Sequence, residues 1–288
     1  WRRSCSWRPT KTCADSSSDA GLLLALNGAD ERLQLALGSL APGEAGEPQG
    51  VSFLAAQEWT VPGSAVRFLA PGIRQMLAAL GLSATDIRRI ACVNGPGSFT
   101  GLRMSLALAQ GLAAATGAEL AGLNHLELLA CEAAQTLEAD AGAVAALVWS
   151  RRGQVYAQAF QRGVGRPAPL GPPQVLALSA LPEFFAALPR PLRLLGGGLR
   201  RNLPFFAELA GQDPGLRLLP AHWDAPRASA LLELASSANY GANDARQALE
   251  PVYLRASDAE DNIAAIAAGR GLSAGDAQAI LDRGSRPL

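Results

Sequence analysis

The sequence predicts an α/β protein in which helices pack on mixed sheets, and three observations indicate it. Short apolar runs typical of buried strands alternate along the chain with longer segments of helical periodicity. A hairpin signal comes first, and a strand, a helix, another strand and another helix follow it. The second of these helices is entered through a glycine-rich turn. This order is typical of a sheet that combines antiparallel and parallel strands.

The hydrophobic pattern places each of these elements. Leucines fill the first strand and alternate along the second, and apolar residues recur at three- and four-residue steps in the first helix. Asn27-Gly28 supplies the hairpin turn. In the first half of the chain we expect strands over 22–26, 33–37, 51–60, 90–93 and 119–122 and helices over 65–80, 102–116 and 124–137. In the second half we expect a hairpin over 144–149 and 155–160, and a β/α alternation over 181–188, 192–195, 199–210 and 228–238.

The glycine-rich turn spans residues 94–103, Asn-Gly-Pro-Gly-Ser-Phe-Thr-Gly-Leu-Arg. Gly95 and Gly97 permit positive φ, and Ser98 or Thr100 can cap the helix that follows. Free amides and the positive end of the helix favour an anion, so these four residues are weak candidates for cofactor binding. The alternative is a well-formed helix start without a ligand. Gly196-Gly197-Gly198 offers a second glycine turn, for which an ordinary turn is the preferred interpretation.

Several catalytic motifs are excluded by the residues present. A P-loop requires a lysine in the loop, and the only lysine of the chain is Lys11. A nucleophile elbow requires glycine two residues before the serine, where Pro96 stands. The two histidines, His125 and His222, form neither a His-x-x-x-His nor a His-Glu-x-x-His metal motif. For His125 a polar helix cap is the preferred interpretation over a general base, and His222 beside Trp223 suggests surface packing.

Composition indicates a globular chain of one or two domains. Hydrophobic residues make up 49% of its 288 residues, charged residues 17%, and the formal net charge is zero. A neutral chain is a poor candidate for binding nucleic acid by itself through phosphates. No apolar run is long enough to cross a membrane, so we expect a cytoplasmic protein. Its cysteines are expected to be small buried hydrophobes in a reducing compartment: Cys5, Cys13, Cys92 and Cys131.

Nine consecutive residues of the glycine turn, Gly95 to Arg103, resemble the signature of the bacterial TsaB (YeaZ) family in the Gcp-like superfamily. Residues 251–255, Pro-Val-Tyr-Leu-Arg, resemble a second motif of that family. The resemblance covers residues 22–255 and implies an actin/sugar-kinase/Hsp70-like (ASKHA) fold of two similar lobes. We therefore expect the following divisions: a disordered or non-native tail over 1–20, a first lobe over 21–123, a second lobe over 124–255, and a helical extension over 256–288.

The resemblance also implies that this chain has lost the groups that handle nucleotide. Family members tend to carry Asp-Thr-Ser at the first hairpin turn, where this chain has Asn27-Gly28-Ala29. A family segment that usually carries acidic residues has Ser150 and Gln154 at those positions. We therefore expect no catalytic residue, cofactor or metal in this chain, with ATP and metal used elsewhere in the complex.

By resemblance, the chain is a non-catalytic partner in making threonylcarbamoyladenosine on transfer RNA. Such a subunit binds a TsaD-type transferase, helps recruit a TsaE-type ATPase, meets tRNA only through the complex and can dimerise when alone. The expected interface lies on two helices and comprises Arg103, Ala107, Gln110, Gly111, Ala114, Leu69 and Ile73. The alternatives are a free-standing nucleotide-binding regulator of the same fold, or an enzyme in its own right, either a kinase-like phosphotransferase or a glycoprotease-like metallopeptidase.

Overall fold

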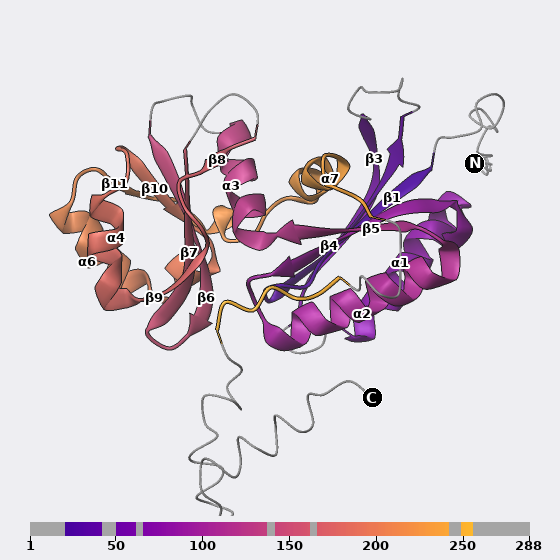
Figure 1. The fold of residues 1–288 in the computed structure, drawn as a ribbon, viewed down its shortest axis with the longest axis horizontal. Coiled ribbons are helices and arrows are strands. Elements are labelled where there is room, and N and C mark those ends of the chain that lie inside the picture. The colour runs from indigo at the N-terminus through magenta and orange to yellow at the C-terminus, as the bar shows by residue number, and fades with distance from the viewer. Residues whose placement is uncertain are drawn as a thin grey trace, which may run out of the picture.

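The computed structural model describes residues 21–41, 50–61, 66–136, 142–161, 166–241 and 249–255. The expected tail over 1–20 and the expected helical extension over 256–288 lie outside these ranges. Within them the chain forms two lobes, each built on one sheet (Figure 1). No helix in the described ranges is long and apolar enough to cross a membrane.

The first lobe is built on a five-stranded sheet with the order β3-β2-β1-β4-β5. Its strands are β1 (Leu22–Asn27), β2 (Arg32–Leu40), β3 (Val51–Thr60), β4 (Ile87–Gly95) and β5 (Glu119–Asn124). The strands β1, β2 and β3 pair antiparallel, as the hairpin signal predicted. β4 joins β1 in parallel and β5 joins β4 in parallel, so each of these connections needs a helix to cross over.

The second lobe repeats this arrangement. Its strands are β6 (Ala143–Arg151), β7 (Gln154–Gln161), β8 (Ala168–Pro169), β9 (Gln174–Ala177), β10 (Leu192–Leu195) and β11 (Leu216–Leu218). The order is β11-β10-β6-β7-β8, and β9 also pairs with β7. An antiparallel hairpin is again extended by two parallel strands on the side of its first strand. Two similar mixed-sheet lobes confirm the predicted ASKHA fold class, whereas the exact lobe boundaries stay a prediction.

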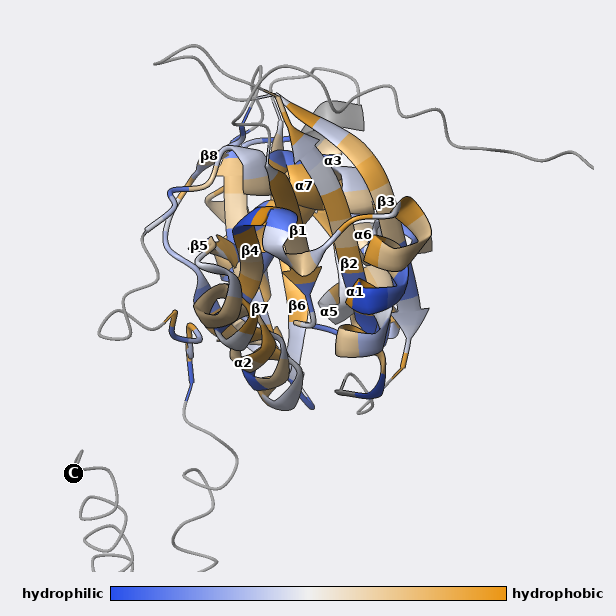
Figure 2. Cartoon of the chain, turned by 90° about the vertical axis from the view of Figure 1, so that its right-hand side faces the viewer, coloured by the Kyte–Doolittle hydropathy of each residue, from blue (hydrophilic) through white to orange (hydrophobic). Residues whose placement is uncertain are grey.

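The helices cover both faces of each sheet (Figure 1). In the first lobe α1 (Val66–Leu80) and α2 (Phe99–Thr116) pack on one face and α7 (Ala228–Ser236) on the other. In the second lobe α4 (Leu181–Ala186), α5 (Gly197–Arg201) and α6 (Leu203–Gln212) cover one face. Short 3₁₀ helices span Ala84–Asp86, Leu178–Ala180 and Ala221–Trp223. Figure 2 shows the hydrophobic strands β1, β4 and β6 enclosed by these layers.

The helix α3 (His125–Thr136) lies between the lobes and contributes to the core of both. Leu128 and Cys131 pack with the first sheet and with α7. Leu126 and Leu129 pack with β6, β7 and Trp223 of the second lobe. Because these side chains are 7% exposed or less, a helix with two apolar faces joins the two lobes.

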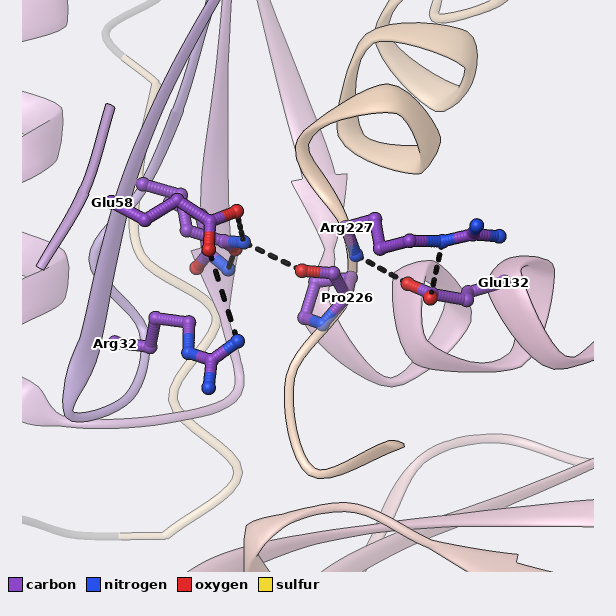
Figure 3. A network of polar contacts seen from close by, with 7 residues as sticks. Arg32, Glu58, Glu132, Pro226 and Arg227 are labelled. Carbon is purple, nitrogen blue, oxygen red and sulfur yellow. Dashed lines mark hydrogen bonds and ion pairs between the residues drawn. The ribbon is translucent and has the colours of Figure 1, made fainter. Parts of the chain in front are cut away.

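Polar contacts fix the chain where it returns from the second lobe to the first (Figure 3). On β2, Gln34 donates from Nε2 to the Pro226 carbonyl at 2.6 Å and to the Glu58 carboxylate at 2.8 Å. The next residue, Arg227, donates its backbone N–H and its Nε to Glu132 on α3. Gln34 is fully buried and Glu132 is 5% exposed, so these contacts hold α7 onto the first sheet.

The helix expected over 199–210 is wrong in one respect, because the structure divides it into α5 and α6. The break falls at Asn202, whose φ of −120° is not helical. Two residues later comes Pro204, which has no N–H and whose ring would clash with a carbonyl four residues earlier in a continuous helix. The Asn202 side chain instead donates to the Gly198 carbonyl at 2.8 Å and closes α5.

The glycine turn after β4 packs directly on the turn of the first hairpin. Ser98 donates its backbone N–H to the Ala29 carbonyl at 2.6 Å. A Cβ on Gly97 would lie 2.2 Å from that carbonyl oxygen, and a Cβ on Gly101 would lie 2.1 Å from the carbonyl oxygen of Gly28. Glycine is required at both positions because a backbone segment occupies the space of a side chain.

This packing predicts opposite effects for two alanine substitutions on the same helix. Gly101→Ala is expected to destabilise the protein by about 1–3 kcal/mol, because the methyl group displaces the hairpin turn. Gly111→Ala, where nothing lies within 4 Å of the added Cβ, is expected to stabilise it by about 1 kcal/mol through helix propensity. Urea unfolding followed by circular dichroism measures both. A neutral Gly101→Ala would contradict the close contact.

Closed inter-lobe cleft and candidate partner surface

The glycine turn places its polar groups against its own chain. The Ser98 hydroxyl accepts from the Gly101 N–H at 3.4 Å, as expected of a helix cap, and the Ser98 carbonyl accepts from the Leu102 N–H at 2.9 Å. Gly95 is buried against the strand-like segment that carries Val252. Of the four weak candidates for cofactor binding, Ser98 and Thr100 are exposed near the helix start, Gly97 is half-buried and Gly95 is buried.

The second glycine turn faces a carboxylate of the first lobe. Residues 196–198 connect β10 to α5, and Gly196 adopts a φ of +103°. A Cβ on Gly197 would lie 2.7 Å from Oδ2 of Asp30, which belongs to the first hairpin turn. Negative charge at this distance opposes the binding of a phosphate to the turn.

An ion pair joins the first hairpin turn to α5 across the cleft. Glu31 of the first hairpin pairs with Arg201 at the end of α5. The Arg201 guanidinium also lies over the Trp149 ring, with 4.4 Å between Cζ and the ring centroid. The cleft between the lobes is therefore closed at this point by side chains of the chain itself.

The His125 side chain lies inside this region and is 1% exposed. Its Nδ1 is 3.2 Å from the Pro96 carbonyl oxygen, which can only accept, so we assign the proton to Nδ1. Burial lowers the pKa of His125, and the nearby negative charge of Asp30 opposes this in part. The imidazole is therefore neutral and enclosed, which does not suit a general base that must reach a substrate.

The expectation that His125 caps a helix is wrong. The cap is provided by the preceding residue, Asn124, whose Oδ1 accepts from the backbone N–H groups of Leu126 at 2.9 Å and Glu127 at 3.4 Å. The exposed His222 lies beside Trp223 with 5.3 Å between ring centroids, as expected of surface packing. Within the described ranges, no group of three His, Cys, Asp or Glu side chains could hold a metal ion.

A segment near the end of the described chain, residues 249–255, runs along α2 and β4, and we call it the strap (Figure 1). Its Val252 donates its N–H to the Asn94 carbonyl at 2.7 Å, and Asn94 donates from Nδ2 to the Glu250 carbonyl at 3.2 Å. The Gln110 side chain on α2 donates to the Leu249 carbonyl at 2.7 Å. The two sequence motifs, about 150 residues apart in the chain, are thus in direct contact.

The strap engages two of the residues expected at the partner interface. Arg103 donates from Nε to the Tyr253 hydroxyl at 2.8 Å, and Gln110 is the residue that binds Leu249. Leu69 and Ile73 are 2% and 6% exposed and belong to the core of the first lobe. These four residues therefore have a packing role within the chain, and their contact with a partner stays a prediction.

The other expected interface residues form an open stripe on α2. Ala107, Gly111 and Ala114 are exposed and are spaced by four and three residues, which places them on one face. A shallow hollow of about 350 Å³ lies between α1 and α2. It is lined almost entirely by apolar side chains: Ala70, Ile73, Arg74, Leu77, Ala78, Leu82, Ala84, Leu108 and Leu112. Together the stripe and the hollow form what we call the α1–α2 face.

Comparisons with known proteins find similarity to TsaD-type and TsaB-type proteins. The family model described as TsaD, tRNA N6-adenosine threonylcarbamoyltransferase, matches residues 65–177. The tRNA threonylcarbamoyladenosine biosynthesis protein TsaB of Escherichia coli is 38% identical over 92 residues, which cover 32% of this chain and 39% of that protein. The protein of the same name from Bacillus subtilis is 28% identical over 190 residues, which cover 66% of this chain and 79% of that protein.

Similarity to a solved structure extends over a larger part of the chain than these sequence matches do. A solved structure from Pseudomonas aeruginosa, of a protein described as similar to the peptidase YEAZ, aligns with a TM-score of 0.60 at 26% identity. The alignment covers 82% of this chain and 100% of that one. By these comparisons the chain is similar to proteins of the TsaB (YeaZ) family. The two sequence motifs that resemble TsaB proteins are the two that the strap brings together.

Sequence reasoning missed several residues at the inter-lobe cleft and at the strap. The acidic pair Asp30 and Glu31 follows the hairpin turn, but no pattern indicated that it faces α5 of the other lobe. Phe99 lies inside the glycine motif and was treated only as part of it. Its ring stacks on Tyr253, a contact that local periodicity does not reveal.

The buried imidazole predicts a pH dependence of folding. Because burial lowers the pKa of His125 in the folded state, the unfolded state binds the proton first, and stability falls as pH drops through about 6.5. His125→Gln keeps a donor for the Pro96 carbonyl and removes this titration. Urea unfolding between pH 8 and pH 5 should show a smaller loss for the variant, with a difference in slope of at most about 1.4 kcal/mol per pH unit. Equal slopes would show that His125 does not titrate in this way.

Proposed function

We propose that this chain is a non-catalytic subunit in the biosynthesis of threonylcarbamoyladenosine on tRNA. In this role it binds a TsaD-type transferase through the α1–α2 face and helps recruit a TsaE-type ATPase. The observation that carries the proposal is the α1–α2 face itself, which combines an open stripe of small residues with an apolar hollow. The names of the E. coli and B. subtilis relatives supply the pathway.

Small residues let another helix approach closely. Ala107, Gly111 and Ala114 leave the α2 backbone accessible along about two helical turns, and a Cβ on Gly111 would meet nothing within 4 Å. The hollow beside them offers apolar area that a partner's side chains can bury. A partner of the same fold has helices at the equivalent place, so the match to the TsaD family model supports helix-on-helix docking. A second copy of this chain can use the same face when the transferase is absent.

The closed cleft supports a role without catalysis. At the turns where this fold is expected to bind phosphate, Asp30 faces Gly197 and Glu31 pairs with Arg201. The histidine nearest to the cleft is enclosed and bonded to a backbone carbonyl. These contacts count against a nucleotide site at the two turns and against His125 as the base of a metallopeptidase.

Charged bulk on the stripe is expected to prevent assembly with the transferase. When the purified chain is mixed with the TsaD-type subunit of the same organism, light scattering should give the mass of a heterodimer. Ala107→Arg and Gly111→Arg should each abolish that mass, because an arginine side chain holds the two helices apart. Absence of a complex with the wild-type chain, under conditions in which the transferase is folded, would refute the proposed function.

The matched control for this experiment is Gly211→Arg. Gly211 is an exposed helical glycine on α6, and a Cβ there also meets nothing within 4 Å. This variant adds the same side chain to the second lobe and should form the heterodimer as the wild type does. If it also loses the complex, the effect of the two α2 variants is not specific to the α1–α2 face.

The isolated chain is expected to show no saturable binding of Mg-ATP. The reason is the electrostatic cost of placing phosphates beside the carboxylates of Asp30 and Glu31. Isothermal titration calorimetry measures the heat of Mg-ATP binding. The TsaE-type ATPase, titrated under the same conditions, is the positive control. A one-to-one binding heat from the isolated chain would favour the nucleotide-binding regulator instead.

A further inference from the structure

Three side chains form an exposed stack where the strap crosses the start of α2. The rings of Phe99 and Tyr253 are stacked with 4.7 Å between centroids and an interplanar angle of 22°. The Arg103 guanidinium lies 3.9 Å above the Phe99 centroid and 5.7 Å from that of Tyr253. Its Nε donates to the Tyr253 hydroxyl, which fixes the plane of the guanidinium. We call these three side chains the platform.

The platform is held on rigid backbone. Phe99 and Arg103 are one helical turn apart on α2, and Ser98 caps the helix directly before them. On the other side, Val252 is bonded to Asn94 of β4. A Cβ on Gly95 would lie 2.7 Å from the Val252 carbonyl oxygen, so the two segments touch through their backbones. The platform is therefore preorganised before any ligand arrives.

Anchoring the strap does not require the rings to be exposed, yet Phe99 and Tyr253 keep 37% and 41% of their surface accessible. Arg103 is also exposed, and it takes part in no ion pair with any described residue. An uncompensated positive charge thus lies beside two accessible aromatic rings. This combination suits a ligand that has a flat π face and a negative charge close to it.

We propose that Phe99, Arg103 and Tyr253 form a stacking platform for an unpaired nucleotide of an RNA. A base stacks on the exposed ring faces, and the guanidinium faces the phosphate of the same or the next nucleotide. The proposal rests on the proposed function, in which the RNA is a tRNA. Because the net charge of the chain is zero, the platform is a local contact that adds to a larger RNA surface in the assembled complex.

The position of the platform fits this role. Phe99 and Arg103 continue the stripe of Ala107, Gly111 and Ala114 toward the start of α2. If a partner subunit covers the small-residue part of that stripe, the platform lies at the edge of the interface. There it is accessible to a nucleotide of an RNA that spans both subunits.

The test is the affinity of a fluorescently labelled tRNA transcript, measured by anisotropy at low salt. Phe99→Ala and Tyr253→Ala should each weaken binding about tenfold, which is the size expected for losing one base–aromatic stack. Tyr253→Trp keeps a π face and should retain the wild-type affinity. The titrations are done with the chain alone and with the chain mixed with its TsaD-type partner.

Two controls make the outcomes distinct. Phe53→Ala removes an aromatic side chain that is 52% exposed on the edge strand β3, and it should leave RNA binding unchanged. Light scattering reports the mass of the complex for every variant.

Equal RNA affinity of wild type, Phe99→Ala and Tyr253→Ala would overturn the proposal, as would the absence of RNA binding by the wild type in both forms. Loss of the complex in both platform variants would also overturn it, because the platform would then belong to the protein interface.

If the wild-type chain forms no complex, the proposed function fails, but the titrations of the chain alone still decide the platform. Weaker RNA binding by the two alanine variants than by Phe53→Ala would support it in that case as well. Thermal unfolding of each variant shows whether it is folded. If an alanine variant is not folded, the RNA affinity of Tyr253→Trp is compared with that of the wild type instead.

Discussion

The contact on which most of this structure depends is the direct approach of three backbone segments at the start of α2. Gly97 and Gly101 contact the backbone of the first hairpin turn, and Gly95 contacts the backbone of the strap, with no side chain between these segments. Ser98 donates to Ala29 in the middle of this contact. Any Cβ at the three glycines would require the neighbouring backbone to move. A motif that resembles an anion-binding loop is therefore a packing device in this chain.

This arrangement has consequences for the cleft. Once the glycine turn is pressed against the first hairpin, the residues that follow the hairpin turn, Asp30 and Glu31, are directed at α5 of the second lobe. Their carboxylates meet a glycine turn and an arginine there. The chain keeps the two turns that an ASKHA protein uses for phosphate. The charged side chains between these turns are its own Asp30, Glu31 and Arg201. Closure of the lobes at this point thus has the same physical origin as the packing of the glycine turn on the first hairpin.

The same contact also shapes the outer surface of α2. The strap takes up Gln110 and Arg103 and leaves the small residues of the helix open. It adds Tyr253 to the exposed start of the helix, where Phe99 and Arg103 already lie. One side of a single helix therefore offers an aromatic and cationic end followed by a flat stripe that another helix can approach.

The sequence by itself determined the strands and helices of both lobes and the position of the glycine turn, because hydrophobic periodicity and turn residues are local signals. The lack of a metal motif can be read from the printed sequence, whereas the open side of α2 was expected only by resemblance. It did not determine the short strands β8, β9 and β11, which are paired by their neighbours rather than by their own pattern. Only the tertiary structure decided that His125 is enclosed and that Tyr253 stacks on Phe99. Those outcomes depend on contacts between residues far apart in the chain, and local spacing carries no information on such contacts.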